Sequence, residues 1–567
     1  MRTSMAALLL LLWPLAANAL SWSAYDLGLY GISPTQHYVS TAFTSPQMNI
    51  LQWDARCERD GAYVLISPRG YQVENPGPIM LDNRGNLVWT ETRFGQVTNL
   101  QVQQYRGESY LTFWAGASYG PHSNGSYYML DSAYDIAKKV DAVGPDVAGD
   151  LHEFKITENN TALMTIYQDH EVECSRLGID SSSSCWINDG LFQEVDIETG
   201  DLIFQWRASD HVKISDSYKG RGSEGTSKEN SYDYFHINSV HKDPQGNYYI
   251  SSRYMFTVYC ISPAGDILWY LGGKNNNFTD LSGGYATNFA YQHHANWHAN
   301  NTFTIFDNNG NNVFHNPSEF SRGMTVSLDL TAMTATLLRT YVHPDRILAI
   351  SQGSIQQLPD SGNVFVGWGN SPAYTEFTGE GEVLCNVHYG AGLFFELIDL
   401  GWVKSYRSFK GQWVGKPKTR PDIKVVGGQV YVSWNGATEL AGWRLQSAAS
   451  ADATDGDFKD VDQLPRETFE TAFVLGDVEG LFFRAAALDK SGAVLGYTNV
   501  THSTPEPTVT PFLSIIVLAL FLLGAFLVVR RYRSAISRQL WKISSTRKSS
   551  PQQYELLNSD DEPNIRG

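Results

Sequence analysis

Residues 236–254 read HINSVHKDPQGNYYISSRY, and the rest of the chain repeats the plan of this stretch. Two runs containing β-branched and aromatic residues flank Pro244-Gln-Gly-Asn247, which has the composition of a tight turn. The pattern predicts a β-hairpin, with His236 at the start of its first strand and Arg253 near the end of its second.

Four other stretches share this plan, each with a polar turn between two extended runs: 99–114, 152–167, 293–306 and 354–368. A second unit, a turn glycine followed by a strand, recurs at 85–89, 200–204 and 265–269. Together with a candidate strand at 62–68, hairpins at spacings of roughly 50–80 residues are typical of propeller blades with insertions. We therefore expect an all-β chain whose residues 20–417 form a six-bladed β-propeller, with an array of β-sandwiches as the alternative.

Residues 418–505 differ from this repeat and alternate like the strands of a small sandwich. The strand-like runs lie at 430–434, 442–445 and 481–487. About 90 residues suit an immunoglobulin-like or fibronectin-III-like β-sandwich. A Cys…Trp…Cys frame is lacking, which favours the fibronectin-III-like version.

Both ends of the chain predict membrane targeting. Residues 1–19 resemble a signal peptide, with Arg2, a short apolar run and Ala17-Asn-Ala19 as a cleavage signature. A stalk at 506–510 leads into 511–529, which contains no charged residue and is long enough for a single transmembrane helix. Three arginines follow directly, so the positive-inside rule assigns 530–567 to the cytosol. We expect a single-pass type I membrane protein of the secretory pathway.

Composition excludes several classes of protein. With 567 residues, of which 42% are hydrophobic, the chain can bury a large core and is not a disordered protein. The net charge is −17, and setting aside +4 in the tail and +1 at Arg2 leaves −22 on residues 20–510. Nucleic-acid binding needs a basic surface, so a nucleic-acid partner is not expected.

Covalent modification also fits an exported protein. Five asparagines begin N-x-S/T glycosylation triplets: Asn124, Asn159, Asn277, Asn300 and Asn499. Of the five cysteines, Cys174 and Cys185 are expected to form a disulfide across the serine-rich loop between them. Cys260 lies in an apolar run and could be a buried free thiol, and the pairing of Cys57, Cys260 and Cys385 stays open.

When the hairpins are aligned by their turns, polar residues occupy the start of each inner strand. They are Gln101, His152, His236, His293 and Ser354. Equivalent strand starts face one mouth of a propeller channel, so the three histidines should converge. They could bind a metal such as zinc or copper, or act as nucleophile and acid–base groups. Arg253, on the return strand beside His236, favours an anionic group over a metal cation.

Several of these segments resemble the motifs of the arylsulfotransferases (arylsulfate sulfotransferases, ASST), fungal-type branch. The matching segments are 150–154, 236–239, 251–253, 292–293, 306–308, 321–323 and 367–369. The resemblance covers about residues 60–415 and implies a six-bladed propeller. It also implies transfer of a sulfuryl group from a phenolic sulfate ester to a phenolic acceptor, without a nucleotide donor. We therefore expect no cofactor and no metal, and small aromatic molecules as partners.

The resemblance further implies a role for each matching residue. His293 would be the nucleophile that forms a sulfohistidine, while His152, His236 and Arg253 would hold the sulfuryl oxygens. Asn238 would support them. Because His293 is followed by His294, the nucleophile is ambiguous by one position, and His294 and Ser354 are kept as substrate-binding candidates.

Two other functions compete with sulfuryl transfer. The propeller could be a non-catalytic binding or adhesion module, or the same histidines could serve a metal-dependent hydrolase or oxidase. In the tail, Tyr554-Glu-Leu-Leu557 resembles a tyrosine-based sorting signal that adaptor proteins recognise. The compartment stays open between plasma membrane, endosome and vacuole. A solvated tail is the alternative.

Overall fold

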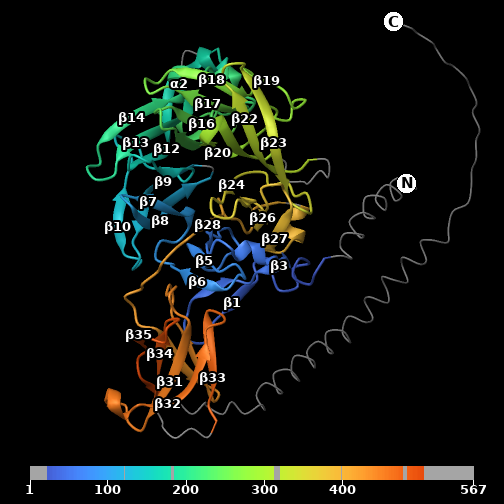
Figure 1. Ribbon diagram of the computed structural model, residues 1–567. Coiled ribbons are helices and arrows are strands. Elements are labelled where there is room, and N and C mark those ends of the chain that lie inside the picture. The colour runs from blue at the N-terminus through green and yellow to red at the C-terminus, as the bar shows by residue number, and fades with distance from the viewer. Residues whose placement is uncertain are drawn as a thin grey trace, which may run out of the picture. The chain divides into compact units, whose positions relative to one another are not determined.

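The protein is described by a computed structural model that covers residues 22–120, 122–180, 184–311, 319–397, 399–476 and 482–502. These residues form almost only β-strands, joined by loops and a few short helical turns (Figure 1). All strand pairs but one are antiparallel; the exception is the short β19 against β23. The prediction of an all-β fold is confirmed.

Six sheets of four or five strands account for residues 49–411. The first three contain, in spatial order, β28 (Phe409–Gly411), β4 (Tyr63–Ile66), β5 (Ile79–Leu81) and β6 (Leu87–Thr90); β10 (Ile136–Val140), β9 (His122–Leu130), β8 (Glu108–Tyr119) and β7 (Val97–Tyr105); β11 (Phe154–Ile156), β12 (Thr161–Glu173), β13 (Ser184–Asp196) and β14 (Leu202–Arg207). The other three contain β15 (Ile237–Lys242), β16 (Tyr248–Ser252), β17 (Thr257–Ile261) and β18 (Ile267–Gly272); β19 (Thr279–Asp280), β23 (Thr334–Val342), β22 (Arg322–Asp329), β21 (Thr302–Asp307) and β20 (His293–His298); β24 (Ser354–Gln357), β25 (Val364–Gly367), β26 (Ala373–Phe377), β27 (Val383–His388) and β3 (Asn49–Gln52).

The five hairpins expected from the sequence are present as β7–β8, β11–β12, β15–β16, β20–β21 and β24–β25. The turn between β15 and β16 places Gly246 at φ +91°, a conformation that glycine adopts without steric cost. The three glycine-strand units are β6, β14 and β18. Turn chemistry and alternating apolar residues were therefore sufficient to locate these elements.

Contacts between strands link the six sheets in cyclic order. The chain of contacts runs β28–β7, β7–β11, β12–β15, β15–β20, β20–β24 and β24–β28. Large apolar clusters lie between successive sheets, such as the one that joins β12–β13 to β15–β17. Because the first strand of each sheet faces the next, residues at these strand starts come together although they are far apart in sequence.

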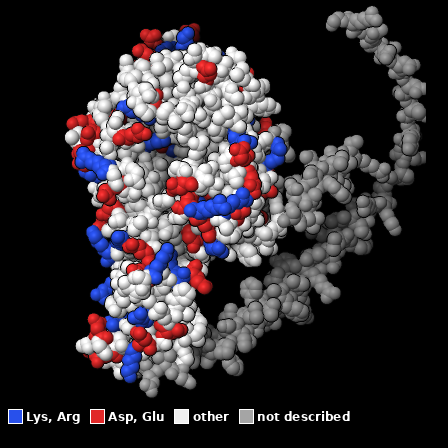
Figure 2. All heavy atoms as spheres, in the orientation of Figure 1, with Lys and Arg blue, Asp and Glu red and all other residues white. Residues whose placement is uncertain are grey.

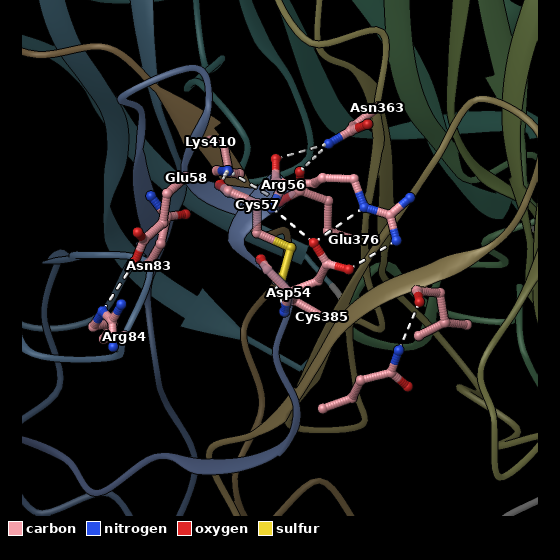
Figure 3. The surroundings of a disulfide bond; sticks show 12 residues. Asp54, Arg56, Cys57, Glu58, Asn83, Arg84, Asn363, Glu376, Cys385 and Lys410 are labelled. Atoms are coloured by element: carbon pink, nitrogen blue, oxygen red, sulfur yellow. Dashed lines mark hydrogen bonds and ion pairs between the residues drawn. A yellow bond between two sulfur atoms is a disulfide. The ribbon is translucent and has the colours of Figure 1, made fainter.

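The cycle is closed by strands from both ends of this region. β28 completes the sheet of β4–β6, and β3 extends the sheet of β24–β27. A disulfide joins Cys57, in the 3-10 turn Ala55–Glu58, to Cys385 in β27 (Figure 3). Beside it, the buried Nζ of Lys410 donates to the Cys57 carbonyl at 2.6 Å and to Glu376 Oε2 at 3.0 Å. The sequence alone did not show that Cys57 pairs with Cys385.

The other three cysteines are distributed as follows. Cys174 and Cys185 form a disulfide at the end of the β12–β13 hairpin. Cys260 in β17 is a buried free thiol, and burial raises its pKa to about 12. At neutral pH it is therefore protonated and unreactive.

Two smaller sheets share one apolar core within residues 422–502. They contain β29 (Asp422–Val426), β30 (Gln429–Ser433) and β33 (Glu470–Val474); and β32 (Lys459–Pro465), β31 (Gly442–Ala448), β34 (Phe482–Leu488), β35 (Val494–Tyr497) and β36 (Thr501–His502). Trp443, Leu445, Val432 and Phe483 are buried between them. The fibronectin-III-like assignment stays a prediction.

No helix in the described part of the chain is long and apolar enough to cross a membrane. The predicted signal peptide (1–19), stalk (506–510), span (511–529) and tail (530–567) all lie outside the described residues. All five predicted glycosylation asparagines are exposed. Acidic and basic side chains are interspersed over the face in Figure 2, so the net acidity is not gathered in one patch there.

Candidate active site

The starts of several inner strands surround a cavity of about 250 Å³. His236 directly precedes β15, Arg253 directly follows β16, His293 begins β20, and His152 lies just before β11. All four line the cavity and are nearly buried. The remaining lining residues are Arg69, Gly120, Leu151, Tyr254, Ser351, Gln352, Lys404 and Tyr406.

Each of the three histidines has its Nδ1 atom held by a buried partner. His152 Nδ1 lies 2.8 Å from Asp150 Oδ2, and His236 Nδ1 lies 2.5 Å from Asp233 Oδ2. The partner of His293 is instead neutral: its Nδ1 lies 2.7 Å from Asn308 Oδ1. Two histidines are therefore paired with carboxylates, and the third with an amide.

The hydrogen bonds around Asn308 fix the tautomer of His293. Asn308 Nδ2 donates to the carbonyls of Ala349 and Gln352, at 2.7 and 2.9 Å, so its oxygen must face His293. Nδ1 of His293 is then the protonated nitrogen, and Nε2 accepts from the Gln352 amide at 3.2 Å. Burial, with the charge of Arg253, holds the pKa of His293 well below its usual range. The result is a neutral imidazole whose Nε2 lone pair faces the cavity wall at Gln352.

Asp233 binds a second histidine, which sequence reasoning missed. His122 Nε2 lies 3.3 Å from the same Asp233 oxygen that contacts His236. Burial opposes the charge on Asp233, but the two histidines outweigh it and hold the pKa of this carboxyl well below its usual value. Burial lowers the pKa of His236 to about 3, whereas Asp233 overcomes burial and raises that of His122. Asp233 therefore favours the charged form of His122.

Three permanent or titratable cations give the cavity a positive lining. Arg253 donates through Nη2 to the Ile350 carbonyl at 2.8 Å, while its buried Nη1 has no partner. Arg69 donates to Gln352 Oε1, and burial lowers its pKa to about 10. Burial and the nearby Arg69 lower the pKa of Lys404 to about 8. No carboxylate is among the described residues that line the cavity, so the site suits an anion.

Several residues around the cavity have left-handed backbone conformations. The φ angles are +55° at His236, +50° at His294 and +67° at Gln352. The strand registers shift at the same places, between Ile237 and Ser239 and between His293 and Asn296. Such bulges aim side chains out of the regular alternation, and strained residues of this kind gather at functional sites.

The other candidate residues lie near the cavity but do not line it. His294 has its ring nitrogens against the Ile355 amide and the Asn296 side chain. Ser354 exchanges hydrogen bonds with the backbone of Ser408. Asn238 donates to the Gln292 carbonyl at 2.7 Å, directly before His293. The structure therefore gives Asn238 a place behind the nucleophile candidate.

Ligand atoms of His122, Asp233 and His236 lie within 4.8 Å of one another, as in a metal site. Asp233 Oδ2, however, is already shared by both histidines, and Arg253 and Lys404 line the adjoining cavity. A cation would be repelled there. The cluster is better explained as a hydrogen-bonded support for His236.

Comparison with known proteins identifies one family. The model of the family described as arylsulfotransferase (ASST) matches residues 101–390, just over half of the chain. No curated protein matches.

Solved structures match only distantly. A protein of unknown function from Bacteroides caccae is 11% identical and covers 62% of this chain and 98% of its own, with a TM-score of 0.34. A protein from Lactobacillus plantarum is 11% identical and covers 73% and 99%, with a TM-score of 0.31. The major Malassezia sympodialis allergen Mala s 1 is 10% identical and covers 60% and 86%, with a TM-score of 0.27. TM-scores this low do not define a common fold.

Proposed function

Because this chain belongs to the arylsulfotransferase (ASST) family, we propose that it transfers a sulfuryl group from a phenolic sulfate ester to a phenolic acceptor. The six sheets, linked in cyclic order, would be the blades of a β-propeller. The cavity at its strand starts would be the active site, and His293 the nucleophile.

One observation carries this assignment: the Nδ1 partner of His293 is an amide, whereas those of His152 and His236 are carboxylates. An amide whose nitrogen is already held by two carbonyls can only accept from Nδ1, so it fixes the lone pair of His293 on Nε2. His293 is thus the histidine that combines a neutral partner with a fixed lone pair, and we assign it as the nucleophile. The cations around it match the charge of a sulfate ester.

In the first step, Nε2 of His293 attacks sulfur, the S–N bond forms and the S–O bond to the aryl group breaks. Negative charge grows on the sulfuryl oxygens and on the departing phenolate. Arg253 Nη1 and Lys404 stabilise the sulfuryl oxygens, and the Gln352 amide, released from Nε2, donates to them as well.

The leaving phenolate takes a proton from His152. Asp150 Oδ2 lies 2.8 Å from His152 Nδ1 and so orients the ring for this transfer. In the second step, the acceptor phenol returns a proton to His152 while its oxygen attacks sulfur and the S–N bond breaks. The mechanism is therefore ping-pong, with one proton shuttled by one residue.

The remaining parts of the chain complete the proposal. Residues 1–19 direct export, 511–529 anchor the protein by one helix, and residues 20–510 lie in the lumen or outside the cell. The exposed sequon asparagines are accessible for glycosylation on that side. Residues 554–557 would act as a sorting signal that directs the protein to the plasma membrane, the endosome or the vacuole.

The test uses the purified full-length protein with a chromogenic aryl sulfate. Donor alone should release one equivalent of phenol in a burst and leave a sulfated histidine detectable by mass spectrometry. Addition of a second phenol should turn this burst into steady sulfate transfer. If neither a burst nor a sulfated histidine appears, the assignment fails. Metal analysis of the active protein separates it from a metal-dependent hydrolase or oxidase.

A further inference from the structure

A second cluster of ionisable side chains lies away from the active-site cavity. It lines a cavity of about 600 Å³ and combines histidine with three carboxylates: Asp26, Asp345 and Glu396. The carboxylates come from the N-terminal turn, from the loop after β23 and from the end of the short helix α3 (Leu393–Glu396). His388, the last residue of β27, joins them.

His388 supplies the observation that points to a ligand. Its side chain is 1% exposed, and Nδ1 lies 3.0 Å from Asp26 Oδ1. The other ring nitrogen, Nε2, is buried without a hydrogen-bond partner. With Nδ1–H directed at the carboxylate, the Nε2 lone pair is free. A carboxylate behind a histidine in this way is the usual outer support of a metal-bound imidazole.

A second histidine and an aspartate lie next to His388. Ligand atoms of His343, Asp345 and His388 are all within 4.8 Å of one another. Nδ1 of His343 accepts from the Asp345 amide at 3.1 Å, so the neutral ring carries its proton on Nε2, and Asn386 interacts with the ring. His343 therefore offers no free lone pair, and His388 is the imidazole that presents one beside the Asp345 carboxylate.

A further carboxylate, that of Glu396, lines the same cavity. A Cβ atom at Gly392 would lie 2.6 Å from Glu396 Oε1 and 3.1 Å from Asp26 Oδ1. These two oxygens therefore converge over a residue that has no side chain. Arg346 also lines the cavity, but its guanidinium lies over the Phe320 ring at 3.9 Å.

From this geometry we propose a binding site for a divalent transition metal, with zinc as its representative, formed by His388, Asp345 and Glu396. Imidazole and carboxylate are ligands that zinc accepts, whereas calcium takes oxygen ligands. Asp26 would orient His388 from outside the coordination sphere. The metal would tie the N-terminal turn to β27, next to the strand β3 that closes the cycle of sheets. The proposal does not depend on sulfuryl transfer.

The test measures zinc binding by the full-length protein after chelator treatment, in competition with a chromophoric chelator. Wild type should bind one equivalent, and zinc should raise its melting temperature. Glu396→Gln and His388→Asn should each weaken zinc binding about tenfold or more, and Asp26→Asn about 10–100-fold. Glu396 is only half-buried, so its variant reports on binding even if the His388 variant folds poorly.

His122→Asn provides the matched comparison, because His122 belongs to the other three-residue cluster. It should leave zinc binding unchanged. Cobalt should give a visible absorption spectrum in wild type that the Glu396→Gln variant lacks. If wild type binds no zinc at micromolar concentration, or if only His122→Asn abolishes binding, the site does not exist as proposed.

Discussion

Asn308 Oδ1 accepts a hydrogen bond from Nδ1 of His293 across 2.7 Å, and so directs the lone pair of the ring to Nε2. The amide itself cannot rotate, because its nitrogen is held by two backbone carbonyls. The reactivity assigned to His293 thus depends on a residue that touches no substrate.

Replacing Asn308 with alanine should lower kcat roughly 10²–10⁴-fold, since the wrong tautomer of His293 becomes accessible. KM for the aryl sulfate should change little. Steady-state kinetics and pre-steady-state bursts measure both quantities. An unchanged burst rate in this variant would show that the tautomer is not controlled by Asn308.

The doubled histidine gives a direct test of the nucleophile. His293→Asn should abolish sulfation of the protein and lower turnover by about 1,000-fold or more. His294→Asn should retain sulfation, because the side chain of His294 does not line the cavity. Mass spectrometry after incubation with donor alone distinguishes the two. The opposite result would move the nucleophile by one residue.

The proposed acid–base residue is tested by varying the leaving group. His152→Asn should slow transfer roughly 10²–10⁴-fold when the donor carries a weakly acidic phenol. A strongly acidic phenol needs no proton to depart, so the loss should then be much smaller. A plot of log kcat/KM against the pKa of the leaving phenol should be steeper for the variant. Equal slopes would exclude His152 from this role.

Lys404 predicts an alkaline limit to donor binding. Its pKa is lowered to about 8, so the ammonium is charged below this pH and neutral above it. For an anionic aryl sulfate, kcat/KM should therefore fall as the pH rises through about 8. The Lys404→Met variant should be slower at pH 7 and lack this limb. A wild-type profile that is flat between pH 7 and 9 would contradict this role of Lys404.

The two disulfides should contribute unequally to stability. Removing the Cys57–Cys385 bond by a double serine substitution should lower the unfolding free energy by about 2–5 kcal/mol, because it closes the longer loop. Cys174 and Cys185 are only 11 residues apart, against 328 for the first pair. Their removal should cost less. Thermal unfolding of both variants, alone and combined, gives the comparison.

Much of this fold could be predicted from the sequence because its hairpins depend on local patterns of residues. Polar turns between apolar runs located the five hairpins, and their alignment brought His152, His236 and His293 to one place. The choice between His293 and His294 was not accessible. A strand that alternates strictly would have decided it, but a register shift and a positive φ interrupt the alternation there.

The rest of the site depends on contacts between distant segments. Arg69 and Lys404 pair through their backbones, 335 residues apart, only because β28 returns to β4. Asp233 precedes its hairpin in a loop with no regular period, so nothing marked it as the partner of His236. Arg69, Lys404 and Asp233 can serve one site only once the cycle of sheets is closed.

The same closure sets an order of events during synthesis. Cys57 is made 328 residues before Cys385; at about 5–20 residues per second, the ribosome needs roughly 15–65 s to supply the partner. In that interval Cys174, Cys185 and Cys260 all emerge, and each is a competitor for the waiting thiol. Correct maturation therefore requires that Cys174 and Cys185 pair early and that Cys260 be sequestered in β17, leaving Cys57 one partner when the last sheet is completed.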